Sequence, residues 1–212
     1  MEARPTLDRP AQVKRVVLAS GNPGKLREFA QLLVDTGFEL VRQSELGIEP
    51  PSETGTTFIE NALIKARNAA RRSGLPAIAD DSGIEVDALD GGPGVYSARY
   101  AGEDASDEAN LTKLLAAMKG VPQARRTARY RCVVVFVEHA DDPHPLVGEG
   151  TWEGSILDGR RGTGGFGYDP SFVSRGDSRT VAEMATDEKH QLSHRGQAMR
   201  AFIAAFRRRS LA

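Results

Sequence analysis

The chain begins with apolar runs that alternate with amphipathic segments. Residues 13–20 have a continuous apolar centre, which predicts a strand, and residues 25–36 repeat apolar side chains at helical spacing. Gly37 is placed to end that helix, and residues 38–41 predict a second short strand before a polar loop over residues 46–55. The order strand, helix, strand is typical of an α/β protein.

The middle of the chain continues this alternation. Residues 56–73 predict a helix that begins with a capping box. Residues 77–79 and 84–86 predict two short strands, separated by the polar segment Asp80-Asp81-Ser82-Gly83, and residues 106–118 predict a third helix. The acidic pair is therefore expected at the end of a buried strand.

Two long strands follow in the second half. Residues 129–139 and 146–156 are rich in β-branched and aromatic side chains, and the charged link between them predicts a hairpin that projects from the body. Ser193 is placed to cap a last helix, whose inward face carries Ala198, Phe202 and Ala205. The fold class we expect is α/β, with a mixed sheet flanked by helices.

The composition fits one compact domain. The 212 residues, of which 40% are hydrophobic, are enough for a domain with its own core. Residues 1–12 are polar and contain prolines, so we expect a flexible extension followed by a single domain over residues 13–212. The 28 basic and 29 acidic residues give a net charge of −1, which argues against a protein that grips long nucleic acid.

Targeting and redox features are sparse. No apolar stretch approaches the ~20 residues that cross a membrane, and the N-terminus has no signal-peptide core. We therefore expect a cytoplasmic protein with no membrane contact. The single cysteine, Cys132, stands in an apolar run and is expected to be a buried strand residue and not a catalytic thiol.

The segment Ser20-Gly21-Asn22-Pro23-Gly24-Lys25 lies between a predicted strand and a predicted helix. A glycine-containing turn there exposes backbone N–H groups at a helix N-terminus, and Lys25 adds a full positive charge. The segment is a candidate phosphate seat, although it lacks the spacing of a P-loop. An ordinary strand–helix turn remains the alternative.

Asp80, Asp81 and the upstream Glu53 are candidate metal ligands. Adjacent carboxylates repel one another, and burying them is costly without a cation. A Mg²⁺ ion would remove that cost because it prefers oxygen ligands, and one carboxylate would then deprotonate a water. For the isolated acidic pair, the favoured alternative is a carboxylate that caps the Ser82-Gly83 turn.

Lys65 lies with Asn61 at the border of an apolar helix face, four residues apart on one side. A lysine in that position can point into a cleft. Taken alone, the pattern favours a side chain that extends to water.

Two further segments suggest a nucleotide. The loop over residues 162–170 places Phe166, Tyr168 and Asp169 among four glycines, where an aromatic ring would stack on a base or simply anchor a tight turn. His194-Arg195 opens the last helix close to Lys189, and positive charge opposes the helix dipole there. A ligand would explain this placement, and a solvated pair is the alternative.

Together these segments resemble the Ham1-like inosine triphosphate pyrophosphatase family, in its bacterial dITP/XTP pyrophosphatase branch. The resemblance covers about residues 16–206 and rests on short motifs in the family's order. They are residues 20–25 (SGNPGK), 53–55 (ETG), 58–62 (FIENA), 65–66 (KA), 79–83 (ADDSG), 93–99 (PGVYSAR), 164–170 (GGFGYDP) and 193–196 (SHRG).

The resemblance implies a two-lobed mixed α/β fold with the active site between the lobes, a homodimer and a Mg²⁺ requirement. It implies that Asp81 is the general base and a metal ligand, that Glu53 is a further metal ligand and that Asp80 supports them indirectly. Catalytic Lys65 and the segment Ser20, Gly21, Asn22, Pro23, Gly24 and Lys25 would hold the triphosphate. The nucleotide and its base would be held by Ser82, Phe166, Gly167, Tyr168, Asp169, Lys189, His194 and Arg195.

The implied reaction is hydrolysis of deaminated purine nucleotides (ITP, dITP and XTP) to the monophosphate and pyrophosphate, which removes them from the nucleotide pool. Donors from Lys189, His194 or Arg195 would accept a six-keto purine and reject adenine. The sequence leaves three alternative functions. They are a Maf-like nucleotide pyrophosphatase with other bases as substrate, a non-catalytic nucleotide sensor, and a nucleic-acid binder that uses the cluster Arg207, Arg208 and Arg209.

Overall fold

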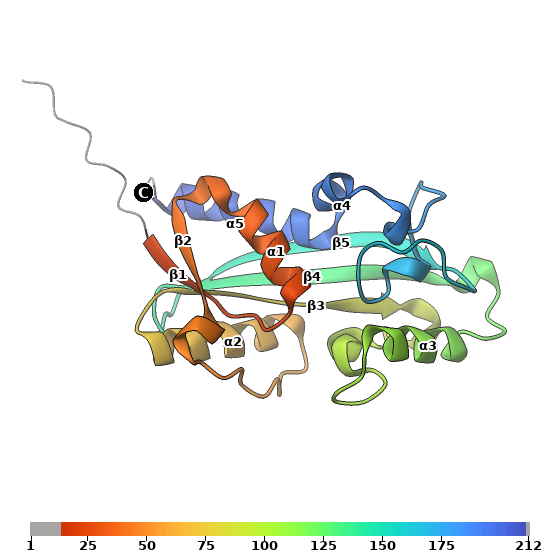
Figure 1. Cartoon of the computed structure of the whole chain (residues 1–212), viewed down its shortest axis with the longest axis horizontal. Coiled ribbons are helices and arrows are strands. Elements are labelled where there is room, and N and C mark those ends of the chain that lie inside the picture. The colour runs from red at the N-terminus through yellow and green to blue at the C-terminus, as the bar shows by residue number, and fades with distance from the viewer. Residues whose placement is uncertain (1–13, 211–212) are drawn as a thin grey trace, which may run out of the picture.

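The computed structural model describes residues 14–210, and Figure 1 shows them as one sheet with helices on both sides. These residues form a six-stranded sheet in the order β2-β1-β3-β4-β5-β6. Its strands are β1 (Lys14–Leu18), β2 (Phe38–Arg42), β3 (Ala77–Val86), β4 (Thr127–Val137), β5 (Leu146–Ile156) and β6 (Phe172–Ser174). β1 pairs in parallel with β2 and β3, while β3, β4, β5 and β6 are antiparallel neighbours. The predicted α/β class with a mixed sheet is confirmed.

The helices are α1 (Pro23–Leu32), α2 (Phe58–Ser73), α3 (Asp107–Ala117), α4 (Thr186–Leu192) and α5 (His194–Ser210). In Figure 1, α1, α4 and α5 lie on one side of the strands and α2 and α3 on the other. The local signals are confirmed where they are strong: Thr57 and Glu60 form the capping box of α2, and Ser193 bonds the Gly196 N–H at the start of α5. The short helix α4 was not predicted.

β3 is one continuous strand, so the prediction of two short strands was wrong. Its ladder with β4 runs without a break from Ala77 opposite Val137 to Val86 opposite Ala128. The paired backbone leaves no turn for a carboxylate to cap. Side chains alternate between the two faces of a strand, so the adjacent acids Asp80 and Asp81 point in opposite directions.

The β4–β5 hairpin is confirmed, but it does not project from the body. Its two strands lie inside the sheet, and α5 packs along them. Glycines on β5 allow this close approach: a Cβ at Gly148 would lie 2.3 Å from the Ala198 carbonyl oxygen, and one at Gly150 would lie 2.0 Å from that of His194. The lack of side chains at Gly148 and Gly150 therefore lets the first turns of α5 pack directly on β5.

The core falls into clusters at two ends of the long strands. One cluster packs around α3 with Ile84, Tyr130 and Phe172. At the other end, one cluster packs under α1 and α5 around Phe29 and Phe202, and another packs under α2, where its members are mostly alanine and valine. This division agrees with the predicted two lobes. The extension predicted over residues 1–12 lies outside the described residues.

β1 leaves β3 between the lobes. It pairs with β3 only at Val17 opposite Ala77 and Leu18 opposite Ile78, and one further bond joins the Ala19 N–H to the Ile78 carbonyl. In open α/β sheets, ligands bind beyond the carboxyl ends of parallel strands, at the point where neighbouring strands separate.

Cys132 is buried as predicted, and burial raises the pKa of its thiol to about 12. In the described part of the chain, no helix has the length and apolarity to span a bilayer.

Candidate active site

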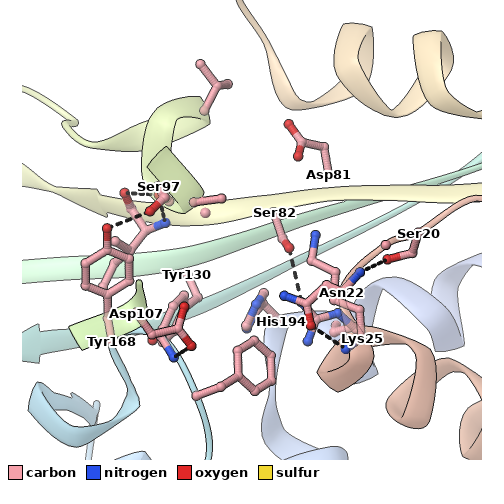
Figure 2. A pocket seen from close by; sticks show the side chains of 18 of the residues that line it. Ser20, Asn22, Lys25, Asp81, Ser82, Ser97, Asp107, Tyr130, Tyr168 and His194 are labelled. Carbon is pink, nitrogen blue, oxygen red and sulfur yellow. Dashed lines mark hydrogen bonds between the residues drawn. The ribbon is translucent and has the colours of Figure 1, made fainter. Parts of the chain in front are cut away.

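A pocket of about 250 Å³ lies at the point where β1 leaves β3. It is bounded by the turn after β1, the middle of β3, the glycine-rich loop and the first residues of α5. Figure 2 shows Asp81 and Ser82 on opposite sides of β3 within this pocket. The two faces of β3 therefore present different charged side chains to the pocket.

On the α2 face, Lys65 joins two carboxylates. Its Nζ lies 2.7 Å from Glu53 Oε1 and 3.2 Å from Asp81 Oδ1. The Asn61 side-chain amide donates to Asp81 Oδ2 at 3.2 Å. Lys65 thus points into the cleft, as the resemblance implies, and the side chain extending to water that the helix pattern alone favours is not found. Although burial lowers the pKa of Lys65, the charges of Asp81, Asp80 and Glu53 outweigh it and raise that pKa.

Arg99 holds Glu53 from the other side. Its Nη1 donates to Glu53 Oε2 at 3.2 Å, and its Nη2 donates to the Glu53 backbone carbonyl at 3.4 Å. Glu53 lies in the loop before α2, and these bonds together with that to Lys65 fix the position of its carboxylate. Sequence reasoning quoted Arg99 within a motif but assigned it no role.

The pKa of Asp81 is raised, and burial is the largest cause. The negative charges of Glu53 and Asp80 also raise it, whereas the positive charges of Lys65 and Lys25 lower it by less. Glu53 and Asp81 fit Mg²⁺ by their chemistry, because both offer carboxylate oxygens, and both lie beside the same ammonium group, that of Lys65. Within residues 14–210, no cluster of three or more His, Cys, Asp or Glu side chains is placed to hold a metal. Mg²⁺ suits this set because it commonly keeps several waters and binds substrate phosphate.

Asp80 occupies the opposite face. Lys25 Nζ lies 3.0 Å from its Oδ2, Arg195 Nε lies 3.6 Å from the same atom, and the Ser82 hydroxyl donates to it at 3.2 Å. Burial alone would raise the pKa of Asp80, but the charges of Lys25 and Arg195 hold it well below the usual range. Asp80 is therefore an ionised anchor for the cations beside the pocket.

The turn after β1 is closed on itself. The Asn22 side chain accepts hydrogen bonds from the Gly24 and Lys25 N–H groups, and the Ser20 hydroxyl accepts one from the Asn22 N–H. The expectation that these N–H groups stand free was therefore wrong. What the turn offers a phosphate is the dipole of α1 and the Asn22, Ser20 and Lys25 side chains.

Arg195 and Lys189 form a buried charge network at the far end of the pocket. Arg195 is 2% exposed and pairs with Glu28 of α1, and its Nη2 donates to the Ser82 hydroxyl at 3.1 Å. Lys189 Nζ lies 2.9 Å from Asp169 Oδ2 and 3.3 Å from Glu28 Oε1. The alternative of a solvated pair at the start of α5 is excluded.

Phe166 lies over these two cations. Lys189 Nζ is 4.4 Å and the Arg195 guanidinium carbon 5.7 Å from the centre of its ring. The loop is shaped for this position: the Phe166 N–H donates to Asp169 Oδ2 at 2.9 Å, and a Cβ at Gly165 would lie 2.2 Å from that oxygen. The ring is an apolar surface on which a base can stack.

His194 stacks on Tyr130, with ring centres 4.6 Å apart and planes 10° from parallel. The Tyr130 hydroxyl donates to Asp169 Oδ1 at 3.1 Å. Burial and the charges of Arg195 and Lys189 hold the pKa of His194 well below its usual value, which favours the neutral ring. Its Nδ1 has no hydrogen-bond partner among the described residues. One ring nitrogen of a neutral histidine donates and the other accepts.

Comparison with known proteins agrees with this geometry. The profile of the Ham1 family matches residues 16–205. The chain belongs to the Ham1 family. A protein of Vibrio parahaemolyticus named dITP/XTP pyrophosphatase is 59% identical over 91% of this chain and 96% of its own. One of Escherichia coli O157:H7 with the same name is 55% identical over 92% of this chain and 99% of its own.

Solved structures of the Ham1 family share the fold. A HAM1 protein from Coxiella burnetii has a TM-score of 0.86 at 44% identity and covers 92% of this chain and 99% of its own. A nucleoside-triphosphatase/dITP/XTP pyrophosphatase from Mycobacterium abscessus has a TM-score of 0.73 at 43% identity, over 88% of this chain and 96% of its own.

Most residues predicted for the site line the pocket of this Ham1 protein. They are Ser20, Gly21, Asn22, Lys25, Glu53, Lys65, Asp81, Ser82, Phe166, Gly167, Tyr168, Asp169, Lys189, His194 and Arg195. Gly24 lies beside the pocket, where a Cβ would meet the Phe166 ring at 3.2 Å. Pro23 begins α1, and its side chain is outside the described residues.

Sequence reasoning missed several residues that the fold brings to the same pocket. These include Gln43, Ser97, Asp107 and Tyr130. Ser97 accepts the Ile84 N–H at 2.9 Å, and Asp107 accepts the Gly167 N–H at 2.8 Å. Strand periodicity placed Tyr130 correctly on β4, but no local signal indicated that its ring faces a ligand site.

Proposed function

We propose that this Ham1 protein hydrolyses deaminated purine nucleoside triphosphates, namely ITP, dITP and XTP, to the monophosphate and pyrophosphate. The observation that carries the proposal is the order of groups along one pocket. An aromatic and donor-rich end, formed around Phe166, leads to a centre where Lys65 joins Asp81 and Glu53. Relatives at 55–59% identity bear the name dITP/XTP pyrophosphatase.

In the proposed reaction, water attacks the α-phosphorus. A P–O bond forms to the water oxygen, the bond to the β-phosphate oxygen breaks, and pyrophosphate leaves. Asp81 accepts the proton of the attacking water, and its contacts with Lys65 and Asn61 orient its carboxylate for that role. Lys65 and Lys25 offset charge on the phosphate oxygens, since such reactions depend mainly on positioning and charge stabilisation.

A Mg²⁺ requirement is part of the proposal. Glu53 and Asp81 are the residues that would hold the ion, and Asn61 and Arg99 orient their carboxylates. When bound, Mg²⁺ supplies positive charge that stabilises phosphate oxygens. The homodimer implied by the family and the cytoplasmic location expected from the sequence both stay predictions.

Specificity for a six-keto purine would come from donors at the far end. Arg195 and Lys189 retain N–H groups beyond those that bond carboxylates, because a guanidinium has five and an ammonium three. Hypoxanthine and xanthine accept a hydrogen bond at the six-position, whereas the adenine amino group would meet donor with donor. Sites that discriminate in this way reach ~10⁴ or more.

A substrate panel tests the proposal. The purified protein is incubated with Mg²⁺ and ITP, XTP, GTP, ATP, dUTP or TTP, and the products are separated by chromatography. We expect IMP or XMP with pyrophosphate, and little product from ATP or GTP. The donors at the six-position account for rejection of ATP alone, because guanine also carries a six-keto group, so rejection of GTP must act on its two-amino group. Preferred turnover of dUTP or TTP would favour the Maf-like alternative, and tight ITP binding without turnover would favour a sensor.

A further inference from the structure

Gln43 is a buried amide that the functional assignments above do not use. It follows β2 directly and begins the short 3₁₀-helix Gln43–Leu46. The residue is 5% exposed and lines the same pocket as Lys65 and Asp81. Its backbone carbonyl accepts the Ile48 N–H at 3.0 Å, which fixes its position.

The Gln43 side chain has no hydrogen-bond partner among residues 14–210, although other buried amides of this chain do. Asn61 bonds Asp81, and Asn110 bonds the backbone at Ala98 and Ala101. The Gln43 amide atoms are not among the fully enclosed side-chain atoms that lack a partner within residues 14–210, so the amide is open to the pocket that Gln43 lines. An amide that is fixed by its backbone, buried and directed at a pocket is therefore a candidate ligand contact.

The sheet register places Gln43 on the face of the reacting centre. Val41 of β2, Val17 of β1 and Ala77 of β3 are paired across the sheet. Val17 and Ala77 pack under α2. Asp81 follows Ala77 by four residues on β3, and side chains an even number of residues apart in a strand share a face, so Asp81 points to the same side. Arg42 keeps an extended backbone (φ −72°, ψ 139°), so Gln43 continues the alternation of β2 and shares this face with Val41.

The order of the strands indicates which part of the substrate lies nearest Gln43. Phe166, Tyr130 and His194 lie on the side of β4 and α5, and Asp81 lies on β3. Gln43 lies on the opposite side of Asp81, two strand spacings beyond β3, or about 10 Å. A nucleotide with its base at Phe166 and its α-phosphate at Asp81 directs its leaving phosphates toward Gln43.

We propose that the Gln43 amide donates a hydrogen bond to the pyrophosphate portion of the substrate. The inference rests on the proposed pyrophosphatase reaction and adds a residue that binds the leaving group. An amide suits this place because it donates to phosphate without adding another positive charge beside Lys25 and Lys65. The contact exists before and during bond cleavage, so it contributes to binding more than to the chemical step.

Inorganic pyrophosphate and IMP are the probes. Their inhibition constants, and KM and kcat for ITP, are measured for the wild type, Gln43→Ala and Gln43→Glu. The matched control is Gln31→Ala, an exposed glutamine on α1 that does not line the pocket. Thermal melting verifies that each variant is folded, and the isosteric Gln43→Glu keeps the test valid if the alanine variant unfolds.

We expect Gln43→Ala to weaken pyrophosphate about tenfold, as for loss of one hydrogen bond to a charged group. KM for ITP rises by a similar factor, while kcat and the IMP constant stay within about twofold. Gln43→Glu weakens pyrophosphate further because its charge repels phosphate, and Gln31→Ala changes nothing.

The inference is overturned if folded Gln43 variants bind pyrophosphate as the wild type does, or if IMP is weakened equally. A wild type that binds pyrophosphate in a Gln43-dependent way but fails to hydrolyse ITP would overturn the proposed function and leave this contact standing.

Discussion

Asp80 and Asp81 are neighbours in the sequence and point to opposite faces of β3. Asp80 meets Lys25 at 3.0 Å on the face of α1 and α5, while Asp81 meets Lys65 at 3.2 Å on the face of α2. Their pKa values accordingly shift in opposite directions, downward for Asp80 and upward for Asp81. Asp80 is therefore an anchor for two cations, whereas Asp81 is the acid that we propose as the base.

Asp81→Asn should keep the fold and lose most turnover. The amide retains the size of the side chain and its contact with Asn61, but it cannot accept the proton of the attacking water. General base catalysis commonly contributes 10²–10⁴-fold, so kcat for ITP should fall by roughly that factor. Near-normal kcat, measured at saturating ITP and Mg²⁺, would remove Asp81 from the role of base.

Asp80→Asn should act mainly on stability. Its carboxylate is 1% exposed and is shared by Lys25 and Arg195, so the neutral amide removes the anion that faces Lys25 and leaves Arg195 with Glu28 alone. Removing one member of a buried charge network typically costs about 3–5 kcal/mol. Urea unfolding measures this cost. A variant as stable as the wild type would contradict the anchoring role.

Arg195→Ala should raise KM for ITP more than it changes hydrolysis of ATP. The guanidinium lies beneath Phe166 at the end of the pocket assigned to the base, so its loss reduces selectivity. The measurement is the ratio of kcat/KM for ITP to that for ATP, which does not depend on the folded fraction. Arg200→Ala, at an exposed position of the same helix, is the control. Equal effects on both substrates would remove Arg195 from base recognition.

Glu28 should make stability depend on pH in the acidic range. Burial opposes ionisation, but the charges of Arg195 and Lys189 outweigh it and lower the pKa of Glu28 below 4.5. A carboxylate whose folded pKa is depressed stabilises the fold above its unfolded pKa, and this contribution is lost as the pH falls through the folded value. Unfolding at pH 7 and below 4.5 should show this loss. Glu28→Gln should be less stable at pH 7 and should lose less on acidification; an unchanged pH dependence would contradict the pairing.

Gly150→Ala should displace the first residues of α5. Its Cβ would lie 2.0 Å from the His194 carbonyl oxygen, so the helix must move away from β5. Overpacking of this kind typically costs about 1–3 kcal/mol, and KM for ITP should rise because His194 and Arg195 shift. Gly159→Ala is the control, since a Cβ there meets nothing within 4 Å. Unchanged melting and KM would show that α5 tolerates the methyl group.

The sequence by itself determined the features that depend on neighbouring residues. The capping box of α2, the hairpin strands and the helix after Ser193 were all predicted, because caps, turns and periodicity are local. The motifs in their order also identified the family and most of the residues that line the pocket. These motifs carry the chemistry, so the candidate acids and cations were recognisable before the fold was known.

Only the tertiary structure decided how those residues divide between two faces. The segment from Asp80 to Gly83 has the composition of a turn, yet pairing with β4 holds it as a strand and separates the two acids. Likewise Lys65 points inward because Glu53 and Asp81 lie there, and Tyr130, Glu28 and Gln43 enter the site from segments with no functional motif. These outcomes depend on hydrogen bonds and charges between residues far apart in the chain, which no local pattern contains.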